Sequence, residues 1–413
     1  MSELLRRYAV RSMWHYFPMP TIADVLVVGL GAVGSSALYQ SAKLGAKAVG
    51  IDRFSPPHDQ GSSHGETRIT RQAIGEGREF VPLVLRSNEI WEELEAATGR
   101  SLITRNGGLV LAASGLVGSH HGSSSFLQDT IDAANEFGIA HERLSADDIR
   151  RRFPQFHLTG DEEGYFEPGA GFLRPEACVE TQIEQARRLG AQVYTEETVL
   201  QVSPANGSVM VKTDKREFEA AKAILTAGPW IAQFLPAQLR QHFRVYRQTL
   251  CWFDLARNAE RYLPEHFPVF IWITGTGVQD MLYGFPAIDG PAGGLKVATE
   301  RYEDTVEPDN VPRDVSDSSV REMFESYIAP RFRDVGNKCL RTATCLYTVT
   351  PDAKFVIDYA DASRSVLFAS ACSGHGFKHS PAVGEALAQK ALCLPTKVDL
   401  SAFCSKRLID SYR

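Results

Sequence analysis

The chain has 413 residues, of which 44% are hydrophobic, and a formal net charge of −6 at pH 7. This length predicts two or three domains with a sizeable core, and the mild negative charge argues against a nucleic-acid-binding surface, which needs a basic excess on one face. No run of about 18 apolar residues occurs, so no transmembrane helix is expected.

The first 22 residues are basic, with Arg6, Arg7 and Arg11 against the single acid Glu3. They lack the apolar stretch of a secretory signal. We predict an N-terminal extension of the folded protein, or an upstream start codon with Met19 as the natural start; an organelle transit segment is the alternative. The C-terminal end is not a Ser-Lys-Leu peroxisomal address, which leaves the cytoplasm as the expected location.

A βαβ unit follows, with a strand over 23–28, a helix over 35–44 and a second strand over 46–51. The turn between the first strand and the helix reads GxGxxG, with Gly29, Gly31 and Gly34. Glycines there permit a tight turn and let backbone N–H groups approach a pyrophosphate, which the helix N-terminus favours. Asp52, at the end of the second strand, can accept hydrogen bonds from ribose hydroxyls. The unit predicts dinucleotide binding without separating NAD from FAD.

The remaining elements follow from apolar periodicity and turn residues. We expect helices over 81–97, 126–137, 146–153, 175–189, 318–328 and 381–391, and strands over 107–112, 192–194, 199–203, 209–213, 223–226, 245–254, 269–273, 281–285, 294–299 and 366–369. Strands and helices alternate at both ends of the chain, and the middle is rich in strands. This pattern predicts a discontinuous nucleotide-binding domain with an inserted second domain.

The cysteines and histidines do not suggest a metal site. The seven cysteines form no CxxC pair, which fits a reducing compartment better than a disulfide framework. His120 and His121 are the only tight histidine pair, and they lie among glycines and serines. We expect this stretch to be a solvated, flexible loop, because zinc would need further ligands at suitable spacing.

Several further motifs occur in a fixed order. They are Pro56-Pro57-His58, Gly65-Glu66-Thr67-Arg68, Gly75-Glu76-Gly77-Arg78-Glu79, Tyr283-Gly284-Phe285-Pro286, Cys345-Leu346-Tyr347-Thr348 and Ser373-Gly374-His375-Gly376-Phe377-Lys378. With the GxGxxG fingerprint, they make the chain resemble the family of monomeric sarcosine oxidase and N-methyltryptophan oxidase, which are flavin amine oxidases. The resemblance extends from about residue 23 to the C-terminus.

The resemblance implies an α/β fold: a Rossmann-like FAD-binding domain of the glutathione-reductase type, with an inserted α+β substrate domain built on a large mixed sheet. The FAD-binding domain is expected to comprise 23–105, 170–240 and 345–413. The substrate domain is expected to comprise 106–169 and 241–344.

FAD is the cofactor that the resemblance implies, with an 8α-S-cysteinyl link to Cys345. Attack on the flavin needs a thiolate, and a nearby positive charge lowers a thiol pKa; Arg341 is close in sequence. Without the motif, Cys345 would read as a small buried hydrophobic residue. The cofactor-binding residues implied are Gly29, Gly31, Gly34, Asp52, Arg53, Val199, Cys345, Gly376 and Lys378.

The resemblance also implies that Arg71 and Lys378 bind a substrate carboxylate. An Arg fork meets a carboxylate in bidentate fashion and a Lys adds a point charge, although each alone is more often a surface charge. Tyr283 and Tyr347 match tyrosines of the substrate pocket. Glu300 departs from the family, which has a histidine at that point, and it puts simple sarcosine in doubt as the best substrate.

Five residues match positions at the flavin ring: Lys296, Arg68, His64, Tyr347 and His375. Lys296 matches the lysine that activates dioxygen, since an ammonium stabilises the superoxide anion; otherwise it is a solvated strand lysine. Arg68 could instead pair with Glu66 or Glu76. His375 could instead be a capped loop histidine.

The function expected from the resemblance is oxidation of a secondary amine, N-methyl or cyclic, of an amino acid. Hydride passes to the flavin, dioxygen becomes hydrogen peroxide, and water hydrolyses the imine, with formaldehyde from an N-methyl group. The alternatives are an oxidase of fructosyl amino acids, opines or pipecolate-type imino acids, a flavin dehydrogenase with another acceptor, and a non-catalytic FAD-binding subunit. We expect a monomer whose partners are a small amino acid and dioxygen, without nucleic acid, membrane or metal.

Overall fold

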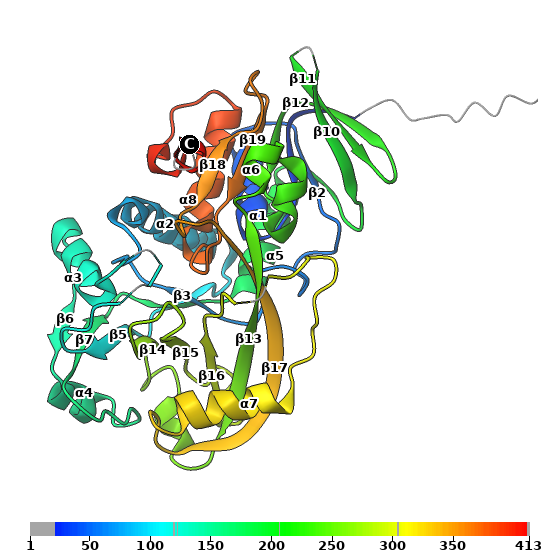
Figure 1. The fold of residues 1–413 in the computed structure, drawn as a ribbon. Helices are drawn as coiled ribbons and strands as arrows, with labels where there is room; N and C mark the ends of the chain where they lie inside the picture. The colour runs from blue at the N-terminus through cyan, green and yellow to red at the C-terminus, as the bar shows by residue number, and fades with distance from the viewer. Residues whose placement is uncertain (1–20, 119, 122, 206, 304, 411–413) are drawn as a thin grey trace, which may run out of the picture.

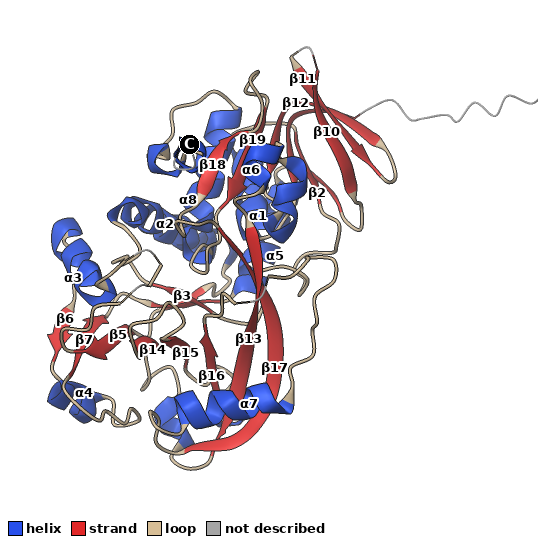
Figure 2. Cartoon of the chain, viewed as in Figure 1, coloured by secondary structure: helices blue, strands red, loops and turns tan. Residues whose placement is uncertain are grey.

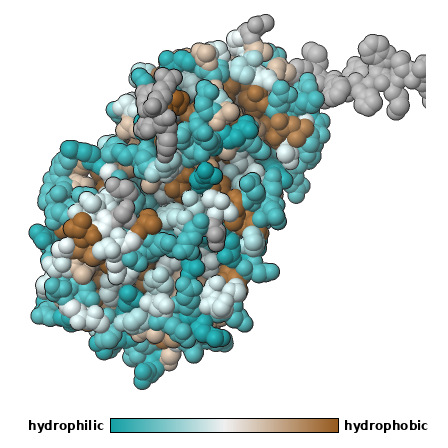
Figure 3. Space-filling model, in the orientation of Figure 1, coloured by the Kyte–Doolittle hydropathy of each residue, from teal (hydrophilic) through white to brown (hydrophobic). Residues whose placement is uncertain are grey.

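A computed structural model describes residues 21–118, 120–121, 123–205, 207–303 and 305–410. The predictions for residues 1–20 and 411–413 lie outside this range. The described chain forms two lobes, each built on a sheet, which meet along the β13–β17 ribbon (Figure 1). No described helix is long and apolar enough to cross a membrane. The face seen in Figure 3 is mostly hydrophilic, with apolar side chains in small groups.

The first lobe is an α/β layer structure. Its sheet has the order β10-β11-β12-β1-β2-β9, with β19 beside β12 and β18 beside β19. The strands are β1 (Thr21–Val28), β2 (Ala48–Ile51), β9 (Gln192–Tyr194), β10 (Val199–Ala205), β11 (Ser208–Thr213), β12 (Glu217–Leu225), β18 (Val356–Tyr359) and β19 (Val366–Ser370). β1 is parallel to both β2 and β12, and its core residues are apolar on both faces, as expected of a strand covered by helices.

Helices α1 (Ala32–Lys43), α5 (Pro175–Arg188), α8 (Ser380–Ala391) and α2 (Val81–Thr98) pack on this sheet and on one another (Figure 2). Short helices α6 (Ala237–Arg240) and α9 (Lys406–Asp410) lie at the other face, beside each other.

The second lobe is a mixed sheet with the order β17-β13-β16-β15-β14-β5-β7-β6. Its strands are β5 (Gly108–Ala113), β6 (Glu142–Leu144), β7 (Glu162–Glu167), β13 (Arg244–Leu255), β14 (Val269–Ile273), β15 (Met281–Phe285), β16 (Leu295–Thr299) and β17 (Val335–Val349). Helices α3 (Phe126–Phe137), α4 (Ala146–Arg152) and α7 (Asp317–Met323) flank it. A third, small sheet joins β3 (Arg68–Thr70), β8 (Gly171–Leu173) and β4 (Ile103–Thr104).

Short 3₁₀ turns connect several elements: η1 (Arg78–Phe80), η2 (Gly228–Phe234), η3 (Ala259–Tyr262), η4 (Pro291–Gly293), η6 (Phe377–His379) and η7 (Ser401–Phe403). The stretch η5 (Phe324–Ile328) is a π-helical continuation of α7.

The predicted α/β fold class is confirmed, and most predicted elements occur within a few residues of their expected ends. The fifteen-residue strand β17 was not predicted, because its first half is largely exposed and carries no apolar alternation. β17 also spans positions 344 and 345, where the sequence placed a domain boundary.

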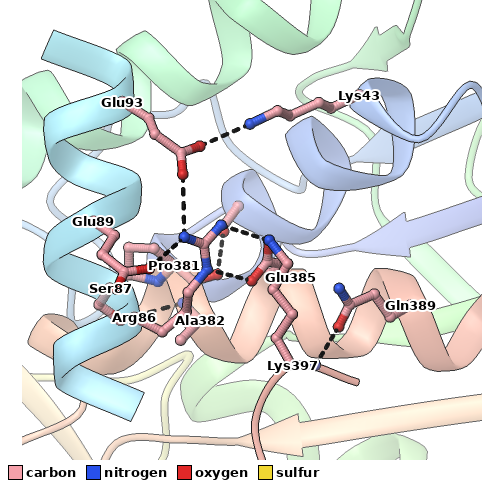
Figure 4. A network of polar contacts seen from close by, with 11 residues as sticks. Lys43, Arg86, Ser87, Glu89, Glu93, Pro381, Ala382, Glu385, Gln389 and Lys397 are labelled. Atoms are coloured by element: carbon pink, nitrogen blue, oxygen red, sulfur yellow. Dashed lines mark hydrogen bonds and ion pairs between the residues drawn. The ribbon is translucent and has the colours of Figure 1, made fainter. Parts of the chain in front are cut away.

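A cluster of charges joins α2 to α8 (Figure 4). Arg86 on α2 donates two hydrogen bonds of 2.8 Å to the two carboxylate oxygens of Glu385 on α8. It also pairs with Glu89 and Glu93 on its own helix. Since α2 follows the loop of Arg71 and α8 follows Lys378, this pair fixes the segments that carry the two predicted carboxylate-binding cations.

Candidate active site

One cavity extends from the fingerprint turn of the first lobe to the sheet of the second lobe. Its walls come from the turn after β1, the 52–63 loop, the start of β10, the 226–234 segment, β14, β15 and the 369–378 segment. Of the predicted site residues, it is lined by Gly29, Gly31, Asp52, Arg53, Val199, Arg68, Arg71, Tyr283, Glu300, Tyr347, His375, Gly376 and Lys378.

The fingerprint end has the form of a phosphate cradle. Gly29 has a positive φ of 86°, and a Cβ on Gly34 would lie 1.8 Å from the Gly29 carbonyl oxygen, so the turn admits no side chain there. The N-terminus of α1 opens into the cavity. Asp52 accepts the Leu30 N–H at 2.7 Å, which ties the end of β2 to the turn. These features fit the pyrophosphate of FAD.

Further along this end, Arg53 lies between two aromatic rings, with its guanidinium 5.5 Å from the Phe54 ring centre and 5.9 Å from that of Trp230. Asp309, from the segment before α7, accepts hydrogen bonds from Arg53 at 2.5 Å and from the Trp230 indole at 2.8 Å. This contact brings a residue of the second lobe against the nucleotide end, and nothing in the sequence pattern had indicated it.

Cys345, near the end of β17, lies against Arg68. The Arg68 Nη2 atom is 3.4 Å from the Cys345 Sγ, and the guanidinium also donates to the Ser62 and Thr67 carbonyls at 2.8 Å each. The positive charge beside the thiol therefore comes from Arg68, because Arg341 pairs with Glu66 instead. Arg68 thus forms neither of the alternative pairs, with Glu66 or with Glu76.

Arg71 and Lys378 lie together at the far end of the cavity, at 3% and 5% exposure. Both face the buried carboxylate of Glu76: Arg71 donates to it, and the Lys378 Nζ lies 3.8 Å from its Oε1. Lys378 also donates to the His375 carbonyl at 2.8 Å. Burial opposes the charged form, yet Arg71 and Lys378 hold the pKa of Glu76 well below its usual value. The group keeps a net positive charge while both cations are protonated.

Tyr283 and Tyr347 form one wall between the two ends, with their hydroxyl oxygens 2.9 Å apart. Burial raises the pKa of both, so both remain neutral. His375 packs against Phe80 and Phe355, at ring-centre distances of 4.9 and 5.0 Å, and burial lowers its pKa well below 6.5. It is therefore a neutral ring in the cavity wall.

Lys296 and His64 lie outside the lining of this cavity, behind the 62–68 segment. The Lys296 ammonium donates to the Gly65 carbonyl at 2.5 Å and to the Thr67 hydroxyl and carbonyl at 2.8 and 3.1 Å. Burial lowers its pKa well below 10.5. Burial, with the charge of Arg68, also lowers the pKa of His64 to about 4.

The prediction of a solvated loop at His120 and His121 is wrong. The two residues are 2% and 8% exposed, and His121 lines the cavity with its Nε2 atom 2.8 Å from the Glu300 Oε2. Burial lowers the pKa of His121, but the Glu300 carboxylate outweighs it and raises the pKa above 6.5. The sequence could not reveal this contact, because the only signal was a carboxylate at 300 where related oxidases have a histidine. Among the described residues, no His, Cys, Asp and Glu side chains group as metal ligands would.

Comparison with known proteins agrees with this geometry. The model of the FAD dependent oxidoreductase family matches residues 24–390. A monomeric sarcosine oxidase from Streptomyces avermitilis is 37% identical over 386 residues, 93% of this chain and 97% of the relative. An N-methyl-L-tryptophan oxidase from Yersinia pestis is 33% identical over 386 residues, 93% and 99% of the two chains. The solved structure of NikD, an amino acid oxidase essential for nikkomycin biosynthesis, has a TM-score of 0.78 at 22% identity over 93% of this chain and 97% of its own, which shows the fold alone.

Proposed function

The chain belongs to the family of FAD-dependent oxidoreductases and is an FAD-dependent amine oxidase; from this premise we propose that its substrate is an amino acid with a secondary amine, whose carboxylate binds at Arg71 and Lys378. The relatives include oxidases named for sarcosine and for N-methyl-L-tryptophan, which supports an N-methyl amino acid. The amine is oxidised to an imine, and water then hydrolyses the imine.

One observation carries the proposal: a single cavity begins at a dinucleotide cradle and ends at two buried cations. Buried cations without a bound anion are costly, so a cavity that opens onto them is suited to an anionic ligand group. An Arg fork and a Lys point charge fit a carboxylate. The Tyr283–Tyr347 pair lies beside this position, and its rings keep water from the amine.

FAD, when bound, supplies the two-electron acceptor for oxidation of the C–N bond. The protein supplies orientation and charge around it. Arg68 and Lys296 are the cations expected at the isoalloxazine ring, and we propose that dioxygen is the final acceptor, with Lys296 stabilising the negative charge formed on oxygen. Hydrogen peroxide is then a product.

We also propose the covalent link between Cys345 and FAD. The contact with Arg68 favours the thiolate that attack requires. Cys372, the neighbouring cysteine in the cavity wall, lacks such a partner: its Sγ accepts the Thr348 N–H, and burial raises its pKa. The two cysteines therefore make a matched pair for a test.

The test of the cofactor is acid precipitation of the purified protein. We expect the yellow colour to stay in the pellet of the wild type and of Cys372→Ser, and to leave the pellet of Cys345→Ser. Release of the flavin from the wild type would refute the covalent link.

The test of the reaction is anaerobic addition of N-methyl amino acids, with loss of the flavin absorption near 450 nm as the readout, followed by admission of air and measurement of peroxide. Bleaching by an N-methyl or cyclic amino acid, with peroxide after aeration, is expected. A flavin that is bleached but is reoxidised slowly by air would indicate a dehydrogenase, and one that no amine bleaches would refute catalysis.

Two further expectations stay proposals. The division into an FAD-binding domain (23–105, 170–240 and 345–413) and a substrate domain (106–169 and 241–344) follows the two sheets in outline. A monomer is supported by the names of the sarcosine oxidase relatives.

A further inference from the structure

Glu300 follows β16 and is a buried carboxylate in the cavity wall, 4% exposed. Its Oε2 atom accepts a hydrogen bond of 2.6 Å from the Tyr302 hydroxyl and lies 2.8 Å from the His121 Nε2. Both partners therefore bind the same oxygen. Among the described residues, no hydrogen bond reaches Oε1, although a carboxylate oxygen has two lone pairs to offer.

The free oxygen faces the substrate end of the cavity. A Cβ built on Gly374, whose φ is 84°, would lie 3.1 Å from the Glu300 Oε1 and equally far from the rings of His121 and Tyr347. Oε1 is thus beside the backbone of the 373–378 segment, next to the tyrosine wall. Glu300 and Lys378 are also close enough for the carboxylate to raise the lysine pKa against the effect of burial.

The cavity therefore has opposite charges at two places. Arg71 and Lys378, partly balanced by Glu76, form a positive end, and Glu300 forms a negative wall. A ligand with only a carboxylate would gain at the first and be repelled at the second. An amino acid zwitterion, whose carboxylate and ammonium lie on adjacent atoms of one carbon, matches both.

We propose that Glu300 Oε1 binds the protonated amine of the substrate, so that the enzyme takes its amino acid as the zwitterion. His121 and Tyr302 are positioning residues that occupy Oε2 and leave Oε1 for the ligand. The inference rests on the proposed function, because it assumes that the carboxylate of the substrate binds at Arg71 and Lys378.

The test compares sarcosine with butanoate, which has the same shape but a CH₂ group in place of the NH₂⁺ group. Dissociation constants are measured on the flavin-loaded protein at pH 7, from anaerobic flavin reduction for sarcosine and from perturbation of the flavin spectrum for butanoate. If sarcosine does not reduce the flavin, its spectral perturbation gives the constant instead. The measured quantity is the ratio of the two constants.

In the wild type we expect sarcosine to bind at least about tenfold tighter than butanoate, because each adverse or favourable charge contact in a buried site changes binding by that order. Glu300→Gln should weaken sarcosine, tighten butanoate and bring the ratio to about 1. Glu162→Gln, a buried carboxylate on β7 that does not line the cavity, is the control and should leave the ratio unchanged. A ratio that is the same in Glu300→Gln and the wild type would overturn the inference.

The role of His121 is tested with the same ratio. His121→Gln keeps an N–H donor for Oε2 and should retain most of the selectivity, whereas His121→Phe should lose it severalfold. A merely structural role would weaken both ligands alike and leave the ratio unchanged. The test is independent of turnover: failure of every N-methyl amino acid to bleach the flavin would refute the proposed function, while an unchanged ratio would refute the inference alone.

Discussion

Replacing Arg86 by alanine should destabilise the whole protein. The Arg86 side chain is 12% exposed and that of its partner Glu385 is 7% exposed, and two hydrogen bonds of 2.8 Å join them (Figure 4). Removing one partner of a buried ion pair costs about 3–5 kcal/mol, because the other charge stays buried. Lys397, whose Nζ lies 3.1 Å from the Glu385 Oε1, remains as a partial partner, so we expect the lower end, about 3 kcal/mol.

This free energy converts to a measurable shift of the melting temperature. An unfolding entropy of about 2.1 cal/mol/K per residue gives about 0.9 kcal/mol/K for a chain of this length, so the shift is about 3–4 °C. The measurement is thermal unfolding of the flavin-loaded protein, followed by far-UV circular dichroism. The control is Arg78→Ala, since Arg78 pairs with Glu136 at the surface, with side chains 70% and 41% exposed, and such pairs contribute about 0–1 kcal/mol.

Acid should reduce the difference between the wild type and Arg86→Ala. Burial raises the pKa of Glu385, but hydrogen bonds from Arg86 and Lys397 outweigh it, and the pKa is lowered below 4.5. A carboxyl group with a lowered pKa contributes stability above its unfolded pKa and loses it as the pH falls through its folded pKa. A shift for Arg86→Ala no larger than that of Arg78→Ala at pH 7 would refute the reasoning, because the junction of α2 and α8 would then not depend on this pair.

Two predictions concern the cations of the site. Burial lowers the pKa of Lys378 to about 8, against the raising effect of Glu76, so affinity for a simple carboxylate such as butanoate should fall as the pH rises from 8 to 9.5. Lys378→Arg, which stays charged, should make that affinity independent of pH; an equal decline in both proteins would assign the titration to another group. Lys296→Met should slow reoxidation of the flavin by dioxygen on the order of 10²-fold and slow reduction by substrate far less, measured in separate stopped-flow half-reactions. Equal effects on the two half-reactions would remove the assigned role of Lys296.

The sequence predicted the parts of the fold whose cause is local. The fingerprint turn, the helix 126–137 and the strands 269–273 and 281–285 follow from glycines or apolar periodicity within a few residues, and the structure has them at those positions. The first half of β17 could not be predicted this way, because its pairing with β13, about 90 residues earlier, supplies the hydrogen bonds that its own sequence does not announce.

The same limit applies to the site. The motifs indicated the residues that reach the cavity, but the partners that set their charge come from distant segments. Cys345 meets Arg68 rather than Arg341, its neighbour in sequence, and Arg71 and Lys378 share Glu76. His121 was dismissed as part of a solvated loop because a histidine between glycines and serines has no periodicity; only the fold brings it to Glu300, about 180 residues later.

The two charged ends of the cavity depend on different parts of the fold, and this separates what can vary from what cannot. The cation end is fixed to the first lobe through α2 and α8, and their Arg86–Glu385 pair also supports the cofactor-binding sheet. Glu300 and His121 instead belong to connections of the second lobe, and they contact each other rather than the first sheet. A change at Glu300 can therefore alter the amine that is accepted while the cradle at Gly34 and the contact between Arg68 and Cys345 stay intact. This explains how the chain departs from its relatives at position 300 and still retains every motif at the cofactor end.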